Sequence, residues 1–303
     1  MKVLCIFNPK AGGGKSVKYL EKIKKLFVDY SIEAEIVFTQ FPRHATEIVK
    51  SADLSSYSGL VVAGGDGSFF DVLNGYMNNS GRLNTPLGIL PVGTGNSLSR
   101  DVLDEKNSLE DYIKLIAKGN TKSFDIAMVQ SEKESFYFAN MMGFGMITDI
   151  SETASKLKIF NKMAYTLGVI YNTIKLNSFD LTMTVDDDEY DLDNVFVIVS
   201  NSKYTAGNYL IAPKAKIDDG MLDLIIVNKL RRRDLLKTFP KTFNGSHINT
   251  KFVDYKQGKH ITFNTGKTKI LSPDGEVYGE LPVNISCIPG AINIFANPSG
   301  NLL

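Results

Sequence analysis

Cysteine is scarce in this chain, and no sign of charge dominates it. The two cysteines, Cys5 and Cys287, each lie in an apolar stretch typical of a buried strand. They form neither a disulfide framework nor a zinc-binding pattern, so we interpret them as inert core thiols in a reducing compartment. The 34 Lys and Arg against 33 Asp and Glu give a net charge of +1, which excludes a global field that attracts nucleic acid.

Long apolar runs are also missing. None reaches the roughly 18 residues of a membrane-spanning helix, and the run at residues 3–7 is too short for a signal-peptide core. With 303 residues, of which 43% are hydrophobic and 22% charged, the chain is expected to fold as a soluble globular protein of two domains.

The first third of the chain alternates short apolar runs with helical patterns. Strands are predicted at residues 3–7, 33–39, 59–63 and 86–90, and helices at 17–30, 45–51 and 69–77. This alternation predicts an α/β domain over residues 1–127, in which helices cover both faces of a parallel sheet.

After Asp125, β patterns dominate. The predicted strands are 136–140, 180–185, 194–200, 222–227, 261–264 and 270–271. Helices are predicted near 154–175 and 232–243. We expect a second, mostly antiparallel β domain over residues 128–303, and leave open that its C-terminal tail returns to the first domain.

Three glycine-rich turns follow predicted strands of the first domain. The first, Asn8–Ser16, is not a Walker loop, because Pro9 stands where that motif needs a glycine. The second is Gly64–Ser68, which places Asp66 where open α/β sheets bind ligands, and the third is Gly93–Asn96. A glycine-rich turn can be a merely structural connection, but three at one sheet edge favour a nucleotide site.

Asp66 adds a chemical argument. A carboxylate beside a triphosphate is repulsive unless a divalent cation lies between them or the acid takes part in proton transfer. The second turn therefore indicates Mg²⁺-nucleotide chemistry.

These motifs resemble the diacylglycerol kinase catalytic family, which includes bacterial lipid kinases and sphingosine kinases. The resemblance extends over nearly the whole chain, with C-terminal marks at residues 216–223 and 272–276. It implies a Rossmann-like or phosphofructokinase-like α/β domain, a C-terminal β-sandwich domain, and an active site in the cleft between them that binds ATP.

The resemblance also assigns residues. Its nucleotide-binding positions are Asn8, Lys10, Gly12, Thr39, Gly64, Gly65, Asp66, Gly67, Ser68, Thr94, Gly95 and Asn96. Asp66 would support the phosphates through metal and water. Glu276 corresponds to the general base that takes the proton from the lipid hydroxyl. Without the resemblance, Asp274-Gly275 is typical of a hairpin turn.

Residues 216–221 resemble a structural Mg²⁺ site of bacterial members. By position, Lys216, Asp219 and Met221 would be its ligands, two through main-chain carbonyls and one through a carboxylate, and Asp125 would link the active site to the metal through water. A hard cation accepts such oxygen ligands. An acidic turn before a strand is equally common without a metal.

The chain departs from the family pattern in places. Ser68 stands where Thr is usual and keeps the hydroxyl, while Phe69-Phe70-Asp71 replaces a polar residue followed by Glu. Asp149 lies in a segment that faintly resembles sphingosine kinases, whose aspartate contacts the acceptor.

The implied reaction is ATP- and Mg²⁺-dependent transfer of the γ-phosphate to a lipid hydroxyl, on diacylglycerol, a related lipid or a sphingoid base. The competing interpretations are an NAD kinase-like phosphotransferase and a non-catalytic, membrane-associated nucleotide-binding module. We expect a cytoplasmic protein with peripheral membrane contact and no nucleic-acid partner; a homodimer is left open. The basic segment 229–239 fits either a membrane-docking helix or a solvent-facing one.

Overall fold

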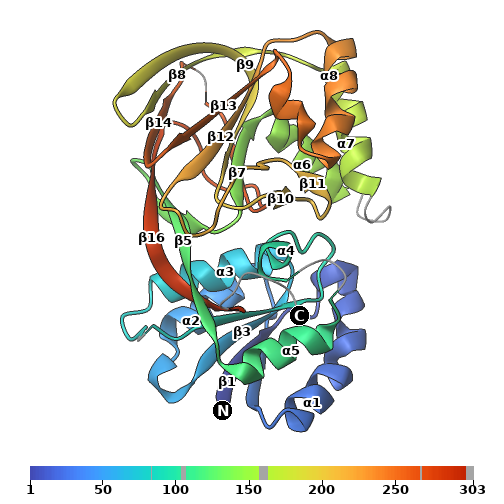
Figure 1. Cartoon of the computed structure of the whole chain (residues 1–303), viewed down its shortest axis with the longest axis vertical. Coiled ribbons are helices and arrows are strands. Elements are labelled where there is room, and N and C mark those ends of the chain that lie inside the picture. Colours follow the sequence, from blue (N-terminus) through green and yellow to red (C-terminus); the bar gives the residue numbers. More distant parts are fainter. Residues whose placement is uncertain (83, 104–106, 157–162, 267, 298–303) are drawn as a thin grey trace. The chain divides into compact units, whose positions relative to one another are not determined.

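A computed structural model describes residues 1–82, 84–103, 107–156, 163–266 and 268–297. The chain divides into two compact units. One holds residues 1–124 and the segment that begins at Gly290, and the other holds residues 125–289. From the sequence, the boundary is predicted at residue 127, and a return of the C-terminal tail to the first domain is left open. The first unit is α/β and the second is mainly β (Figure 1).

The first unit is built on a parallel sheet with the strand order β4-β3-β1-β2. Its strands are β1 (Lys2–Phe7), β2 (Glu33–Phe38), β3 (Gly59–Gly64) and β4 (Leu87–Pro91). The last strand of the chain, β16 (Val283–Phe295), places Ile294 beside Leu87 in parallel register. The carboxyl ends of these parallel strands therefore lie at one edge of the sheet.

Helices flank this sheet. They are η1 (Ala11–Tyr19), α1 (Leu20–Asp29), α2 (His44–Ser51), η2 (Leu54–Ser56), α3 (Asp66–Met77), α4 (Ser99–Val102) and α5 (Leu109–Lys118). One core cluster joins Ile23 of α1 and Ile116 of α5 to Val61 of β3. Helices α2 and α3 pack closely, since a Cβ on Gly75 would lie 2.7 Å from the carbonyl oxygen of Thr46.

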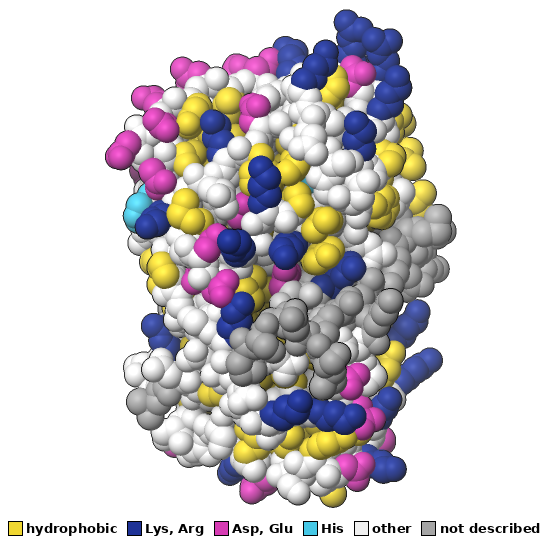
Figure 2. Space-filling model, viewed as in Figure 1, with side chains coloured by type: hydrophobic (Ala, Val, Ile, Leu, Met, Phe, Trp, Pro, Cys, Tyr) yellow, Lys and Arg dark blue, Asp and Glu magenta, His cyan; other side chains and the backbone are white. Residues whose placement is uncertain are grey.

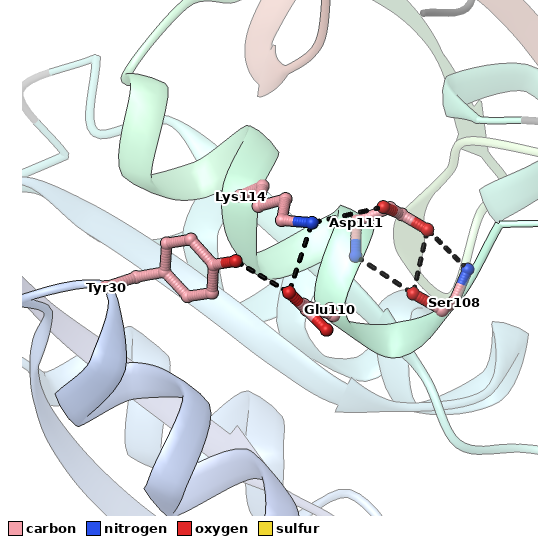
Figure 3. A network of polar contacts seen from close by, with 5 residues as sticks. All are labelled: Tyr30, Ser108, Glu110, Asp111 and Lys114. Atoms are coloured by element: carbon pink, nitrogen blue, oxygen red, sulfur yellow. Dashed lines mark hydrogen bonds and ion pairs between the residues drawn. The ribbon is translucent and has the colours of Figure 1, made fainter.

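No helix is predicted from the sequence at residues 109–118, where the structure has α5. Ser108 caps this helix in a capping box with Asp111, and Lys114 pairs with Glu110 at 3.1 Å (Figure 3). The hydroxyl of Tyr30, beyond the end of α1, donates to Glu110 at 2.7 Å. The capping box is a local sequence signal from which α5 could have been predicted.

Antiparallel strands form most of the second unit, with the order β13-β12-β9-β8-β14-β16. The strands are β5 (Thr121–Gln130), β6 (Ser135–Phe138), β7 (Met141–Gly145), β8 (Phe179–Val185), β9 (Asp188–Ser200), β10 (Tyr204–Thr205), β11 (Tyr209–Leu210), β12 (Leu222–Asn228), β13 (Val253–Gly258), β14 (His260–Asn264) and β15 (Leu271–Pro273). The long strand β9 pairs with β8 along its first half and with β12 and β7 along its second.

The helix predicted near residues 154–175 is wrong as a single element. The structure has α6 (Met146–Lys156) and a separate α7 (Met163–Ile174) packed against it; residues 157–162 lie outside the described part. A Cβ on Gly168 would lie 3.1 Å from the carbonyl oxygen of Ile150, and Asn172 Nδ2 donates to the carbonyl of Asp149. This close helix pairing depends on tertiary contacts that periodicity does not show.

The helix predicted at 232–243 is shorter than expected. It comprises α8 (Arg232–Thr238) and then a 3₁₀ turn, η4 (Phe239–Phe243), because Pro240 has no N–H for an α-helical hydrogen bond. A second 3₁₀ turn, η5 (Ser246–Asn249), follows. Within the described ranges, no helix is both long and apolar enough to span a bilayer.

Candidate active site

The three glycine-rich turns meet at the carboxyl edge of the parallel sheet. A Cβ on Gly93 would lie 2.4 Å from the Cα of Gly65, and a Cβ on Gly12 would lie 3.0 Å from the carbonyl oxygen of Val92. Main chain thus touches main chain, which only glycine permits. The turns predicted from the sequence to form one site do lie together in the first unit.

The first turn carries three successive left-handed glycines, Gly12, Gly13 and Gly14, with φ of 61°, 67° and 83°. Asn8 organises the turn, because its Oδ1 accepts the N–H of Lys10 at 2.9 Å. Added Cβ atoms on Gly13 and Gly14 would meet no heavy atom within 4 Å. The turn is therefore open on that side, with main-chain geometry suited to an anion.

The second turn joins the sheet to α3. Gly65 is the N-cap of α3, and Ser68 in the first turn of the helix accepts a hydrogen bond at 2.8 Å from Asn8 Nδ2. The helix N-terminus adds a partial positive charge at this edge. Ser68 therefore accepts this hydrogen bond through its hydroxyl, a group that the Thr usual at this position would also supply.

Asp66 holds the third turn. Its Oδ2 accepts the N–H of Ser97 at 3.0 Å, and its Oδ1 accepts the N–H of Leu98 at 3.1 Å. Burial raises the pKa of this carboxyl, and the bonds from Ser97 and Leu98 lower it in part. These contacts make Asp66 a positioning residue. Carboxylate oxygens have further lone pairs, so the predicted support of phosphates through metal and water stays a prediction.

Asn96 shapes the third turn from within. It has a left-handed φ of 52°, its Oδ1 accepts the N–H of Gly93 at 3.0 Å, and its Nδ2 donates to the carbonyl of Gly93 at 3.1 Å. Thr94, between them, is exposed. Thr39 follows β2 at the same sheet edge, where its N–H donates to the carbonyl of Phe7.

The departure at Phe69-Phe70-Asp71 is explained by packing. Phe69 and Phe70 are buried in the core, and Asp71 pairs with Arg43 at 3.2 Å. The Arg43 guanidinium also lies 4.8 Å from the Phe70 ring centroid. These side chains link α2 to α3.

In the second unit, the residues predicted to hold Mg²⁺ lie together. The buried carboxylate of Asp125 accepts the N–H of Gly220 at 2.6 Å, and its own N–H donates to the carbonyl of Ile217. Asp219 Oδ1 accepts the N–H of Met221 at 3.1 Å. Asp125 therefore contacts the predicted metal loop, Lys216–Met221, directly.

The donor set of this loop fits a hard cation. Burial, together with the negative charges of Asp125 and Asp219, raises the pKa of Cys287 to about 12, so both carboxylates lie near this thiol. Carboxylate and carbonyl oxygens are the ligands that Mg²⁺ accepts. The described residues contain no cluster of three or more acidic, His or Cys side chains suited to a metal, so a site here would depend on main-chain carbonyls.

Asp274-Gly275 forms the hairpin turn that its sequence suggests. Asp274 and Gly275 have φ of 47° and 84°, and the N–H of Glu276 donates to the carbonyl of Pro273. Asp274 Oδ1 accepts the N–H of Met141 at 2.9 Å, which anchors the turn to β7. Glu276 is exposed on this anchored turn.

Asp149 lines a polar pocket of about 280 Å³ in the second unit. Glu152, Lys175 and Lys269 share the pocket. Burial and the charge of Glu152 raise the pKa of Asp149, while the two lysines lower it. The predicted acceptor contact thus lies in a pocket of mixed charge.

Next to this pocket is an apolar cavity of about 50 Å³, and Met146 lines both. The cavity lies between the sheet and helices α6 to α8, with Ile225 of β12, Val169 of α7 and Leu235 of α8 in its wall. A polar pocket of mixed charge and an apolar cavity therefore adjoin within one unit.

Asp223 is a buried acid that the sequence analysis missed. Its Oδ1 accepts hydrogen bonds from Tyr255 Oη and Gln257 Nε2, and its Oδ2 has no hydrogen-bond partner among the described residues. Burial raises its pKa to about 6. Its position inside the apolar run Leu222–Val227 is the signal that could have identified it.

Two family models match the chain. Residues 2–129 match the diacylglycerol kinase catalytic domain, and residues 140–296 match the YegS C-terminal NAD kinase beta sandwich-like domain. The chain belongs to the diacylglycerol kinase family. Together with its relatives, this makes it a lipid kinase and confirms both the predicted family and the predicted two-domain fold class.

The kinase is 30% identical to the diacylglycerol kinase of Staphylococcus saprophyticus over 299 residues, which cover 96% of this chain and 93% of the relative. It is 27% identical to sphingosine kinase 1 of Arabidopsis thaliana over 91% of this chain and 68% of that protein. A solved Bacillus anthracis structure assigned to the diacylglycerol kinases has a TM-score of 0.81 and 27% identity, with 98% of both chains covered.

Proposed function

We propose that this lipid kinase uses ATP and Mg²⁺ to transfer the γ-phosphate to the hydroxyl of diacylglycerol, a closely related lipid or a sphingoid base. The observation that carries the proposal is the meeting of three glycine turns at one sheet edge, where Asp66 binds the third turn to the second. Such an edge offers main-chain N–H groups and a helix N-terminus to a polyphosphate.

On the donor side, the triphosphate would lie against the open face of Gly13 and Gly14 and the N-terminus of α3. Asn8 and Asn96 hold their turns by side-chain bonds to main chain, so the N–H groups are pre-positioned. The remaining proposed contacts are Lys10, Gly12, Thr39, Gly64, Gly65, Asp66, Gly67, Ser68, Thr94 and Gly95.

On the acceptor side, Glu276 would accept the proton of the lipid hydroxyl as the oxygen attacks the γ-phosphorus. The P–O bond to the β-phosphate breaks, and ADP leaves with the bonding electrons. The anchored turn at Asp274 fixes the main chain of Glu276, and its exposure leaves the carboxylate accessible. Asp66 belongs to the first unit and Glu276 to the second.

The loop Lys216–Met221, together with Asp125, would hold a structural Mg²⁺ through the carbonyls of Lys216 and Met221 and the carboxylate of Asp219. Bound there, the cation would neutralise the acidic loop and fix its conformation. The direct bond from Gly220 to Asp125 keeps the loop against β5.

The acceptor's hydroxyl-bearing head would lie in the polar pocket near Asp149, with part of an acyl or alkyl chain in the adjoining cavity. A cavity of about 50 Å³ accommodates only a short apolar segment as it stands, so a lipid chain would have to widen it. The carboxylate of Asp149 would accept a hydrogen bond from an acceptor hydroxyl or pair with the ammonium of a sphingoid base.

A donor and acceptor panel tests the function. Purified chain is incubated with γ-labelled ATP, with Mg²⁺ or EDTA, and with mixed micelles that contain diacylglycerol, phosphatidylglycerol, an undecaprenol-like alcohol or a sphingoid base; NAD is tested separately. We expect label in one of the lipids only when Mg²⁺ is present. Label on NAD alone would establish the NAD kinase-like alternative, and ATP binding without any transfer would establish the non-catalytic one.

A further inference from the structure

Helices α7 and α8 expose apolar side chains on the second unit. On α7, Ile170, Tyr171 and Ile174 are 51%, 52% and 68% exposed, although Val169 and Thr173 on the opposite side are buried. On α8 and η4, Leu236 and Phe243 are 45% and 51% exposed. Spacings of three and four residues place the α7 side chains on one stripe of the helix.

The two helices adjoin, so these side chains form one surface. Arg232 Nε, at the start of α8, donates to the carbonyl of Ile174 at the end of α7, at 3.2 Å. Phe243 packs on Tyr209 with a centroid distance of 4.7 Å. We call this surface the α7–α8 face: Ile170, Tyr171, Ile174, Lys175, Arg231, Arg232, Arg233, Leu236, Lys237, Lys241 and Phe243.

The α7–α8 face is also strongly basic. Residues 229–243 contain six Lys and Arg and one acid, Asp234, in a chain whose net charge is +1. Lys229 is paired with Asp193 at 2.7 Å, and Asp234 lies 3.8 Å from Arg233. Figure 2 shows Lys and Arg side chains gathered where Figure 1 places α8, with hydrophobic side chains beside them. The positive charge is therefore a local feature of this face.

The inner side of α8 and the start of η4 line the apolar cavity. Leu235, Thr238 and Phe239 face the cavity, while the neighbouring Leu236 and Lys237 are exposed. The segment formed by α8 and the start of η4 thus separates solvent from the cavity that we assign to the lipid chain.

We propose that the α7–α8 face is the surface through which this kinase docks on an anionic phospholipid bilayer. Apolar and aromatic side chains bordered by Lys and Arg are the combination that binds the interface of such a membrane. Docking there places the wall of the cavity against the bilayer that contains the acceptor. The purpose of this docking rests on the proposed function, whereas the evidence for it is the exposed apolar and basic side chains of the α7–α8 face.

Vesicle sedimentation tests the docking. We expect the wild-type chain to sediment with vesicles of phosphatidylglycerol and phosphatidylcholine, more weakly with phosphatidylcholine alone, and more weakly at high salt. Arg233→Glu/Lys237→Glu should reduce the affinity for anionic vesicles by about tenfold or more, given the contribution of each basic residue near an anionic surface. The matched control is Lys22→Glu/Lys25→Glu on exposed positions of α1, which changes the net charge equally and should bind as the wild type does.

A second pair of variants tests the apolar contribution. Ile174→Ser should reduce vesicle affinity several-fold, whereas Val28→Ser, a 76% exposed position on α1, should not. Thermal melting of each variant checks that it folds. Equal vesicle binding by the wild type and Arg233→Glu/Lys237→Glu would overturn the proposal, as would binding to heparin without binding to vesicles, which would assign the face to an acidic polymer.

A water-soluble, short-chain diacylglycerol separates this inference from the proposed function. The docking variants should phosphorylate it at the wild-type rate while losing activity on vesicle-borne lipid. A wild-type chain that phosphorylates lipid yet never binds anionic vesicles would contradict the docking proposal and leave the proposed function intact. A chain that binds vesicles as expected but labels no lipid would contradict the proposed function and leave the docking proposal intact.

Discussion

Asp66 accepts a hydrogen bond from the main-chain N–H of Ser97, and a second one from Leu98, so a carboxylate of one glycine turn determines the position of another. The first residue of α3 thereby fixes the loop that precedes α4. The acid is partly buried, and this desolvation raises its pKa, so its hydrogen bonds offset a desolvation cost. The architecture of the proposed nucleotide site depends on this contact.

We therefore expect Asp66→Asn to disturb the folded geometry of the site, independently of any effect on phosphoryl transfer. An amide in this place presents an N–H₂ group to a main-chain N–H donor, which should cost about 1–3 kcal/mol of unfolding free energy and weaken ATP binding. Urea unfolding and a nucleotide-binding titration measure both effects. Asp29→Asn, at an exposed acid that ends α1, is the control. Unchanged stability together with unchanged ATP affinity would refute the positioning role.

The contact between Gly65 and Gly93 leads to a second prediction. Gly93→Ala would place a Cβ 2.4 Å from the Cα of Gly65, so one main chain must move. We expect a loss of about 1–3 kcal/mol in stability and weaker ATP binding. At Gly81 an added Cβ would have its nearest neighbour at 3.4 Å, so Gly81→Ala should be nearly neutral. Equal melting temperatures for the two variants would contradict the close approach.

Local patterns predicted most of this fold. Strands β1, β3 and β4 are continuous apolar runs because a parallel sheet buries both faces, and the glycine turns after them are visible in the sequence. Periodicity could not reveal that α7 is separate from α6, because their separation is encoded in long-range contacts such as that of Gly168 with Ile150. It also gave no sign of how β9 divides its pairing between three strands.

The candidate active site was less predictable than the fold, because its turns are visible in the sequence but the contacts between them are not. Glycine-rich turns after strands predict a phosphate site from the sequence alone, whereas the hydrogen-bonding roles of Asp66 and Asn96 appear only when the turns are in contact. The contact of Asp125 with Gly220 joins positions far apart in the sequence, so the resemblance could suggest it and spacing could not. Asp223 was missed because strand patterns treat an acid within an apolar run as an interruption.

Metal binding at the loop Lys216–Met221 can be measured through stability. Mg²⁺ without nucleotide should raise the melting temperature of the wild type, because a ligand that binds only the folded state stabilises it. Asp125→Asn should lose most of this increase, since it removes a buried negative charge beside the loop. Asp180→Asn, at an exposed acid of the same unit, should retain it. An equal Mg²⁺ effect in Asp125→Asn would exclude Asp125 from the site.

The buried thiol of Cys5 predicts a pH effect. Burial raises its pKa from 9.0 to about 12, so between these values the unfolded chain releases a proton that the folded chain retains. The thiol's contribution to stability is therefore complete below about pH 9 and falls by about 1.4 kcal/mol per pH unit above it. Cys5→Ala should be less stable than the wild type at pH 8, through lost packing, and the difference should shrink by pH 10.

Urea unfolding at several pH values measures that difference. Cys287 is the internal control, because burial also raises its pKa to about 12 and it is present in both proteins. A difference between wild type and Cys5→Ala that stays constant from pH 8 to 10 would contradict the assignment of a raised pKa to Cys5.

Glu276 provides the most direct test of lipid phosphorylation by general-base catalysis. In Glu276→Gln, turnover with γ-labelled ATP and the accepted lipid should fall by about two to four orders of magnitude, while the affinity for ATP stays at the wild-type value. Glu189→Gln, at an exposed acid in the same unit, should keep full turnover. Wild-type turnover in Glu276→Gln would contradict the account.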